Sequence, residues 1–333
     1  MNQNNKVIMK ILIQMNIDSL MESKIDELKK AHKNLEVFTD TDSAPLSEID
    51  IIAGGLLTEK LIQKSSSLKM IFVPFVGVNH LPLELLKERG IRICNSHGND
   101  RFVAEKVLAL LLAFHGRIVE FHKALENEIW HGFWAGGGAE DTWESLYRKK
   151  VTILGTGAIG RQTAKMLSIF DADVTGYKKH QVKEVIPEGF RRIASNLEDA
   201  VKGAEILIVA VPLTDETRGM VNQDIMNLMK GGVILNIARG PVVDEKALYN
   251  SLTNGTLKGA CIDVWYNYPD PGSKIKAPGN YPFHKLPNVV LSPHVGGGTR
   301  AAFRRDIDLT FANISSYISG GEVQNEIDIN AGY

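Results

Sequence analysis

The sequence predicts an α/β protein with two doubly wound parallel-sheet domains of the Rossmann-like kind and an active-site cleft between them. Short apolar strands alternate with helical patterns along most of the chain, which is typical of parallel sheets. A glycine-rich turn directly follows one apolar strand, at residues 151–160. The length of 333 residues suffices for two domains with substantial cores.

The first domain is predicted from the N-terminal third of the chain. Its elements alternate in type, with strands expected at 10–14, 51–53, 70–73 and 92–94 and helices at 17–31, 57–64 and 82–89. A largely apolar helix is expected at 102–119, and a last helix at 300–319 is expected to return to this domain. The predicted substrate domain is therefore discontinuous, comprising 1–98 and 300–333, and residues 99–299 form the predicted dinucleotide-binding domain.

The second domain is predicted from strands near residues 151, 172, 205, 233, 259 and 289. The turn G-T-G-A-I-G follows the first of them and precedes a helix. Gly155 permits the tight bend, Gly157 lets the backbone approach a pyrophosphate, and Gly160 lets the helix pack close to the strand. Backbone N–H groups at the start of that helix, at Ala158 and Ile159, would then face the phosphates.

The strand at 172–177 bears on the choice of dinucleotide. An NAD site usually has an acidic residue near this strand end to bind the ribose 2′-hydroxyl, but here the strand ends in Lys178, Lys179 and His180. Two lysines attract a 2′-phosphate, so NADP is favoured over NAD. The alternative is that the lysines form a solvated strand end and that NAD is the cofactor.

The composition excludes several classes of protein. Lys and Arg total 38 against 39 Asp and Glu, so neither a nucleic-acid binder nor a membrane-surface protein is expected. The longest apolar stretch, 107–114, is too short to span a bilayer, and the N-terminus lacks the apolar segment of a secretory signal. Cys94 and Cys261 each lie in an apolar run and are interpreted as reduced core thiols of a cytoplasmic protein.

Polar residues at the ends of predicted strands are the candidates for chemistry. Arg239 could hold a carboxylate with its planar donors, and His294 could exchange a proton at neutral pH. Asp263 could bind a nicotinamide carboxamide, and the turn Val76-Gly77 could offer N–H groups to a carboxylate. Each also has an ordinary reading: a surface arginine, a loop histidine, a helix or turn cap, and a plain turn.

Over essentially its whole length the chain resembles the D-isomer-specific 2-hydroxyacid dehydrogenase family. The resemblance is carried, in chain order, by G-T-G-A-I-G at 155–160, V-P-L-T-D-E-T-R-G at 211–219, M-K-G-G-V-I-L-N-I-A-R-G-P-V-V-D-E-K-A-L at 229–248, D-V-W at 263–265 and L-S-P-H-V-G-G-G-T at 291–299. It implies that Arg239 orients the substrate and that His294 is the acid or base. It further implies substrate contacts at Val76, Gly77 and Asn99, and cofactor contacts at Val211, Pro212, Ile237 and Asp263. A homodimer built through 102–119 and the arm after it is implied as well.

One position departs from the family. Members usually have a glutamate five residues after the Asp of D-V, paired with the catalytic histidine, and here that position is Tyr268. A neutral phenol cannot stabilise imidazolium by charge, so the pKa of His294 should be lower than in glutamate-bearing members. The segment 270–286 is longer than the family norm and is interpreted as a lid, an interface loop or a surface insertion.

We therefore expect a hydride transfer between NAD(P)H and a small 2-oxo or 2-hydroxy acid of the glyoxylate or hydroxypyruvate type, with D stereochemistry by resemblance. A phosphorylated acid is disfavoured because no extra cations stand at 76–79. Two alternatives remain. Formate oxidation is suggested by D-V-W, Asn99 and the missing glutamate, and a dinucleotide-sensing, corepressor-like protein without enzyme activity is the other.

Overall fold

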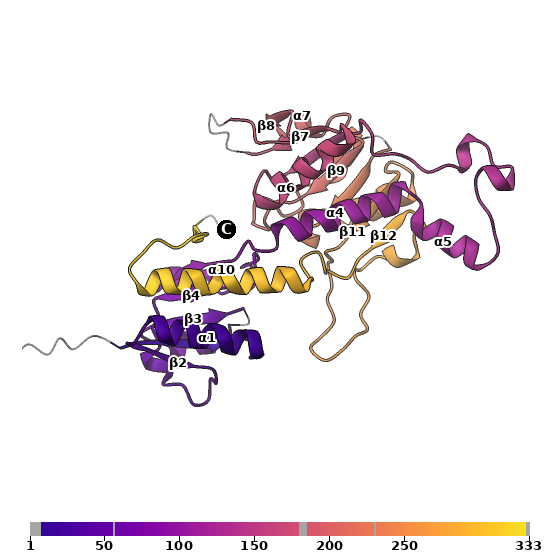
Figure 1. Cartoon of the computed structure of the whole chain (residues 1–333). Coiled ribbons are helices and arrows are strands. Elements are labelled where there is room, and N and C mark those ends of the chain that lie inside the picture. Colours follow the sequence, from indigo (N-terminus) through magenta and orange to yellow (C-terminus); the bar gives the residue numbers. More distant parts are fainter. Residues whose placement is uncertain (1–7, 56, 180–184, 230, 331–333) are drawn as a thin grey trace, which may run out of the picture. The chain divides into compact units, whose positions relative to one another are not determined.

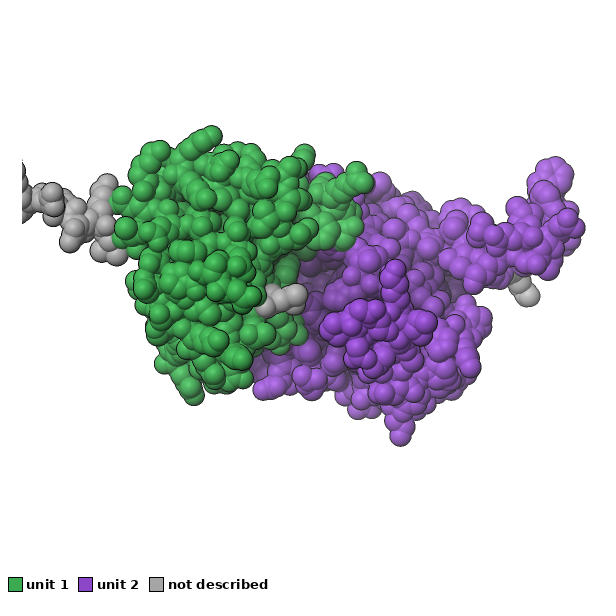
Figure 2. Space-filling model, turned by 90° about the horizontal axis from the view of Figure 1, so that it is seen from below, with its two compact units in different colours: residues 1–99, 298–333 green, residues 100–297 purple. Residues whose placement is uncertain are grey.

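The computed structural model describes residues 8–55, 57–179, 185–229 and 231–330. The chain divides into two compact units, coloured separately in Figure 2: unit 1 comprises residues 1–99 and 298–333, and unit 2 comprises residues 100–297. The predicted division of labour between a substrate domain and a dinucleotide domain stays a prediction.

Unit 1 contains a five-stranded parallel sheet with helices on both faces. In the order β2-β1-β3-β4-β5, its strands are Leu35–Phe38, Met9–Gln14, Ile51–Gly54, Met70–Phe72 and Arg92–Cys94. Successive side chains of β1 enter opposite cores, as the pleat requires: Ile11 and Ile13 pack with one set of helices and Leu12 with the other. The helices are α1 (Ser19–Ala31) and α10 (Arg300–Ile318) on the first face, and α2 (Glu59–Lys64) and α3 (Leu83–Glu88) on the second.

Unit 2 contains a seven-stranded parallel sheet, again covered on both faces. In the order β12-β11-β10-β9-β6-β7-β8, its strands are Val289–Leu291, Gly259–Ile262, Val233–Asn236, Ile206–Val209, Lys150–Leu154, Asp173–Tyr177 and Arg192–Ala194. Helices α4 (Asp100–His115) and α6 (Ala158–Leu167) cover one face, and α7 (Leu197–Val201), α8 (Gln223–Met229) and α9 (Glu245–Thr253) the other. The strand order reverses between β6 and β9, which is where ligands bind in such sheets. The fold class is therefore confirmed.

Three elements differ from the expectations. The predicted helix at 102–119 is two helices, because α4 ends at His115, Arg117 has a left-handed φ of +50°, and α5 (Ile118–Glu126) begins after it. Figure 1 shows α5 and the segment that follows it extending away from the sheet of unit 2. Strands β2 and β8 lie at sheet edges and were not expected. Single 3₁₀ turns occur at Leu46–Glu48, Phe133–Ala135, Ala139–Asp141, Ser168–Phe170, Gly240–Val242 and Phe283–Lys285.

The described helices include none with the length and apolar character needed to cross a bilayer. Cys94 and Cys261 are both buried and free, as expected.

Candidate active site

The turn after β6 leaves space and backbone N–H groups at the start of helix α6. Gly155 has φ +103°, a conformation that favours glycine. A Cβ at Gly160 would lie 2.0 Å from the Gly155 carbonyl oxygen, so the helix packs against the strand end as predicted. In contrast, a Cβ at Gly157 would meet no atom within 4 Å. Helix α6 begins at Ala158, and its N-cap residue, Gly157, has no side chain to bind the N–H groups of the first turn, which includes Ile159. An anion would therefore find both space and hydrogen-bond donors there.

The end of β7 carries the two lysines expected to bind a 2′-phosphate. Lys179 Nζ lies 2.8 Å from a carboxylate oxygen of Glu216, and both side chains are largely exposed. Glu216 belongs to the loop that follows β9. The Lys178 backbone N–H donates to the Ala194 carbonyl of the edge strand β8. His180 lies outside the described residues. A 2′-phosphate at this place would compete with Glu216 for Lys179.

The loops after β9 and β10 hold the other expected cofactor contacts. The Thr217 hydroxyl donates to the Pro212 carbonyl at 2.6 Å, which shapes the loop that begins at Val211. Ile237 is buried beside the end of β10. Asn236 accepts from the Ala238 backbone N–H and donates to the Arg239 carbonyl. The sequence analysis did not single out Asn236, which holds the backbone of the loop that carries Arg239. A buried asparagine at the end of a strand is a signal for this kind of loop anchor.

Arg239 lies three residues beyond the end of β10 and is partly buried. Its Nη1 donates to the Ala238 carbonyl at 2.7 Å. Burial lowers the pKa of Arg239, while the nearby Tyr268 acts in the opposite direction. An arginine starts from such a high pKa that it remains cationic, so its charge stands beside Tyr268 and His294.

Tyr268 and His294 form a direct hydrogen-bonded pair. The Tyr268 hydroxyl lies 2.8 Å from Nδ1 of His294. The same hydroxyl accepts a hydrogen bond of 3.0 Å from the Trp265 backbone N–H. Because Nδ1 faces Tyr268, Nε2 is the ring nitrogen left for a substrate. The structure thus brings together the histidine and the residue at the usual glutamate position.

Asp263 fixes the loop that carries His294. Its carboxylate is buried and accepts hydrogen bonds from the Ser292 hydroxyl, from the Val295 N–H at 3.1 Å and from the Gly296 N–H at 2.9 Å. The Trp265 indole adds a bond of 2.8 Å to the Ser292 carbonyl. The expected contact of Asp263 with a cofactor remains a prediction. The sequence analysis did not predict that Asp263 anchors the loop of His294. A sequence does not show which backbone N–H groups of a distant loop lie next to a given carboxylate.

The pKa of His294 lies below its ordinary value. Loss of hydration is the main cause, and the positive charge of Arg239 lowers the pKa further. The Asp263 carboxylate raises it, but less than the other two effects lower it. Since the phenol of Tyr268 is neutral, it does not supply the negative charge of the usual glutamate. At neutral pH the imidazole of His294 is therefore mainly uncharged.

The remaining predicted residues, Val76, Gly77 and Asn99, belong to unit 1. Val76 and Gly77 lie in the loop after β4, and the Asn95 side chain donates to the Val76 carbonyl at 2.7 Å. The Oδ1 atoms of Asn95 and Asn99 are both buried and, within the described residues, make no hydrogen bond. Asn95 was missed by sequence reasoning, although it directly follows β5 and so stands at a strand end.

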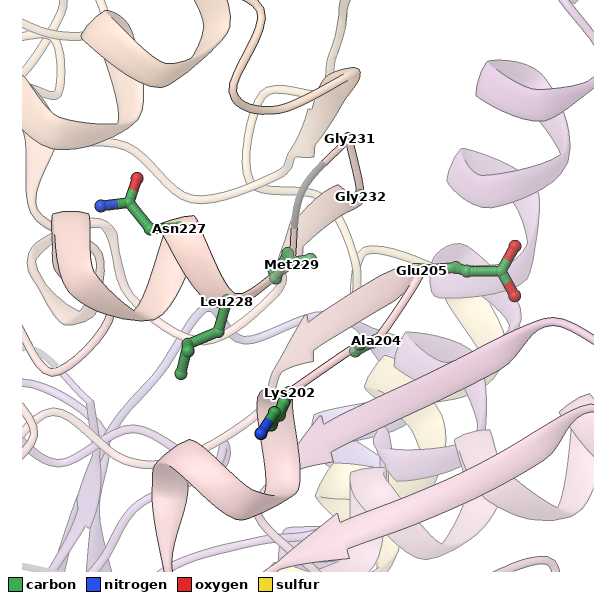
Figure 3. A pocket seen from close by; sticks show the side chains of 9 residues that line it. Lys202, Ala204, Glu205, Asn227, Leu228, Met229, Gly231 and Gly232 are labelled. Atoms are coloured by element: carbon green, nitrogen blue, oxygen red, sulfur yellow. The ribbon is translucent and has the colours of Figure 1, made fainter.

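A shallow hollow of about 500 Å³ lies elsewhere on unit 2. Figure 3 shows Lys202, Glu205 and Leu228 around it. Its lining residues precede β9 and β10, so the hollow lies at the amino ends of these strands. The glycine turn, Arg239 and His294 all follow strands, at the opposite edge of the sheet. This hollow is therefore separate from the candidate site. Among the described residues there is also no cluster suited to a metal ion.

The fold and site define a dinucleotide-dependent oxidoreductase. The sequence pattern of the D-isomer specific 2-hydroxyacid dehydrogenase NAD binding domain matches residues 108–296. The chain belongs to this family, whose members are NAD(P)-dependent 2-hydroxyacid dehydrogenases and reductases. Membership confirms the predicted resemblance and favours an enzyme over a corepressor-like protein.

Relatives and solved structures resemble the chain over most of its length. A glyoxylate reductase of Thermofilum pendens is 33% identical over 275 residues, covering 80% of this chain and 77% of the relative. A glyoxylate/hydroxypyruvate reductase of Arabidopsis thaliana is 30% identical over 284 residues, covering 84% and 83%. The structure of an NADPH-dependent glyoxylate/hydroxypyruvate reductase of Sinorhizobium meliloti, in complex with NADP and malonate, covers 97% of both chains with a TM-score of 0.75 and 25% identity.

Proposed function

We propose that this protein reduces small, unphosphorylated 2-oxo acids of the glyoxylate and hydroxypyruvate type to D-2-hydroxy acids, with NADPH as the preferred reductant. The observation that carries the proposal is the placement of Arg239 and the Tyr268–His294 pair in one group of loops after β10, β11 and β12. A cation for a carboxylate and a proton donor for a carbonyl oxygen are what this reduction needs. The names of the similar reductases support the substrate class.

The residues of unit 2 have separate roles in this proposal. The N–H groups at 157–160 bind the pyrophosphate, and Ile237 contacts the cofactor. A bound dinucleotide supplies the hydride for the substrate C2 atom. Arg239 holds the substrate carboxylate and stabilises the negative charge that develops on the carbonyl oxygen. His294 donates the proton of Nε2 to that oxygen.

Unit 1 supplies the substrate loop in this proposal. Backbone N–H groups at Val76 and Gly77 bind the acid, and the unsatisfied Oδ1 of Asn99 accepts from a donor on the substrate. Hydroxypyruvate has a hydroxyl group that could donate there, whereas glyoxylate does not. We therefore expect both acids to be reduced, with hydroxypyruvate depending more strongly on Asn99.

A substrate panel tests the reaction. Oxidation of NADPH should be measured with glyoxylate, hydroxypyruvate, pyruvate and a 3-phosphorylated 2-oxo acid. NADH serves as the cofactor control. Formate with NADP tests formate oxidation, the alternative suggested by the missing carboxylate at position 268. We expect reduction of the first two acids and no reduction of NADP by formate. If formate reduced NADP and none of the 2-oxo acids were reduced, the proposed function would be wrong and formate oxidation would take its place.

The preference for NADPH depends on Lys178 and Lys179. Changing Lys179 to Ala should lower kcat/KM for NADPH, whereas Glu216→Gln should raise it, because the carboxylate of Glu216 then no longer competes with the phosphate for the lysine. Neither change should alter kcat/KM for NADH by more than about twofold, because NADH has no 2′-phosphate. Equal changes with both cofactors would contradict a role in phosphate recognition.

A second copy of the chain is the proposed partner of unit 2. The arm formed by α5 and residues 127–147 exposes an unusual group of large apolar side chains, among which Phe133 and Trp134 are each 84% exposed. Exposed apolar patches of this kind mark interfaces. The other exposed members are Ile118, Val119, Leu125, Ile129, Trp130, Trp143 and Tyr147. The family also implies a homodimer through this arm.

Sedimentation measures the oligomeric state directly. The double variant Phe133→Ser with Trp134→Ser should shift the protein from dimer to monomer. Ile169→Ser is the matched control, since Ile169 is 82% exposed on unit 2 but lies outside the arm. A dimer that survives the double change would remove the arm from the interface. We further propose a cytoplasmic location, which suits two free thiols.

A further inference from the structure

The hydrogen bonds of Tyr268 define how it can act on His294. A backbone N–H can only donate, so the bond from Trp265 occupies one lone pair of the Tyr268 oxygen. The hydroxyl keeps its own proton and one further lone pair for the contact of 2.8 Å with Nδ1. The direction of that bond then depends on which nitrogen of His294 carries the proton.

Only one neutral form of His294 can serve the reaction. Nδ1 is occupied by Tyr268, so a proton for the substrate must stand on Nε2. A neutral imidazole with its proton on Nε2 has an acceptor at Nδ1. The Tyr268 hydroxyl must therefore donate in the productive state.

We propose that Tyr268 is a positioning residue that acts through His294 in two ways. Before the reaction, its hydroxyl holds His294 in the neutral form with the proton on Nε2. During the reaction, it passes its hydroxyl proton to Nδ1 as Nε2 protonates the substrate oxygen, so His294 remains neutral. This inference rests on the proposed function, in which His294 is the proton donor. It differs from a glutamate partner, which stabilises imidazolium by charge. A phenol cannot do this, but it can give a proton.

The proton balance closes without any further reactant. The Tyr268 O–H and His294 Nε2–H bonds break, and the Nδ1–H bond and the O–H bond of the product form. The imidazole stays neutral and a phenolate remains. Burial raises the pKa of Tyr268 and disfavours this phenolate, and the hydrogen bond from Trp265 and the positive charge of Arg239 offset part of that cost. Nε2 then takes a proton from water, and Nδ1 returns its proton to the phenolate. Each turnover uses one proton from water.

On balance, the surroundings of the pair disfavour an imidazolium at His294. Arg239 at the end of β10 disfavours imidazolium, and the Asp263 carboxylate at the end of β11 favours it but is already bound by three donors. Partial loss of hydration also lowers the pKa of His294, although the residue stays exposed to solvent, so imidazolium is the minor form at neutral pH. Tyr268 is the side chain in hydrogen-bond contact with Nδ1 and can supply a proton there.

Nitrogen NMR of ¹⁵N-histidine-labelled protein tests the first half of the proposal without any substrate. Of the nine histidines, the His294 signals are assigned by their loss in His294→Gln. We expect wild-type His294 to hold its proton on Nε2 at pH 8, and Tyr268→Phe to give a mixture of both tautomers. Tyr266→Phe is the matched control, because Tyr266 donates to the Val243 carbonyl and has no bond to His294. A wild-type proton on Nδ1 would overturn the proposal.

The pH dependence of kcat tests the second half. Tyr268→Phe should lower kcat for glyoxylate at pH 8.5 by about ten- to a hundredfold, within the range of general acid catalysis. At pH 5 the loss should shrink to about threefold or less, because imidazolium then carries its own proton. Tyr266→Phe should leave the profile unchanged. Equal losses at both pH values would refute the relay. Absence of 2-oxo acid reduction by the wild type at every pH would instead refute the proposed function, and the NMR result would still decide the tautomer.

Discussion

His294 has a left-handed backbone, with φ +57°, which costs energy for a residue other than glycine. Hydrogen bonds to the residues on both sides of His294 hold the backbone in this conformation. Asp263 holds the N–H groups of Val295 and Gly296, and Trp265 holds the Ser292 carbonyl. The imidazole is thereby fixed before any substrate binds, which favours catalysis by a preorganised group.

Replacement of Arg239 by Gln should separate turnover from cofactor binding. The proposed role lies with the substrate carboxylate and the developing oxyanion, so kcat/KM should fall by about 10²–10⁴-fold, as for other lost oxyanion stabilisers and bidentate anchors. The dissociation constant of NADPH, measured by fluorescence titration, should change by less than about twofold, because uniform cofactor contacts are retained. Unaltered turnover would remove Arg239 from the mechanism.

The exchange Tyr268→Glu should raise the pKa of His294. A carboxylate at 268 would stabilise imidazolium by charge, whereas the native pKa is lowered by burial and by Arg239. An NMR titration of the His294 ring measures this pKa directly, with Tyr266→Phe as the control. A pKa that stays at the wild-type value would mean that a side chain at 268 does not reach His294 in solution.

At the scale of elements, the glycine turn could be predicted because Gly155 and Gly160 answer local demands of chain geometry, a positive φ and a close approach of helix and strand. The break between α4 and α5 could not, since apolar residues continue through 118 and 119 and the left-handed Arg117 has no sequence signal. Edge strands β2 and β8 were missed because each buries only one residue fully, so neither has the apolar run that indicates a strand. The contacts of Asp263 with Val295 and Gly296 likewise depend on how two separate loops meet.

Two alanine substitutions in the turn should affect different properties, one the melting temperature and the other the affinity for NADPH. A Cβ at Gly160 would collide with the Gly155 carbonyl, so Gly160→Ala should lower the melting temperature, at a cost of about 1–3 kcal/mol for overpacking. A Cβ at Gly157 meets open space, so Gly157→Ala should leave the melting temperature nearly unchanged. It should nevertheless weaken NADPH binding, because the methyl group would occupy the place proposed for the pyrophosphate. Thermal denaturation and fluorescence titration measure both effects, and normal NADPH affinity in Gly157→Ala would contradict the assigned phosphate site.

At the scale of the whole molecule, acid stability depends on a histidine far from the candidate site in the sequence. His115 at the end of α4 is 4% exposed, and the nearest carboxylate oxygen, from Glu144, lies 3.5 Å from Nδ1. Burial lowers the pKa of His115, with a partial offset from Glu144. The folded protein therefore binds a proton there less readily than the unfolded chain, whose histidine pKa is about 6.5.

The sign of this linkage predicts a loss of stability in acid. Above about pH 6.5 both states hold neutral His115 and nothing is lost, whereas below it the unfolded state gains protons first and unfolding becomes easier. Calorimetry of the full chain should show a smaller fall in melting temperature between pH 7.5 and 5 in His115→Gln than in the wild type. His122→Gln, on the exposed face of α5, is the matched control. Identical pH dependence in all three proteins would exclude His115 as the cause.

Helix α10 has a consequence for synthesis of the chain. Phe311 and Ile314 of α10 complete the core that Ile11, Ile13 and α1 begin. While the ribosome is still translating unit 2, the first strands have emerged but lack this covering helix. We expect unit 2 to become resistant to proteases cotranslationally before unit 1 does, and nascent chains stalled ahead of residue 300 to engage chaperones through the uncovered face of β1.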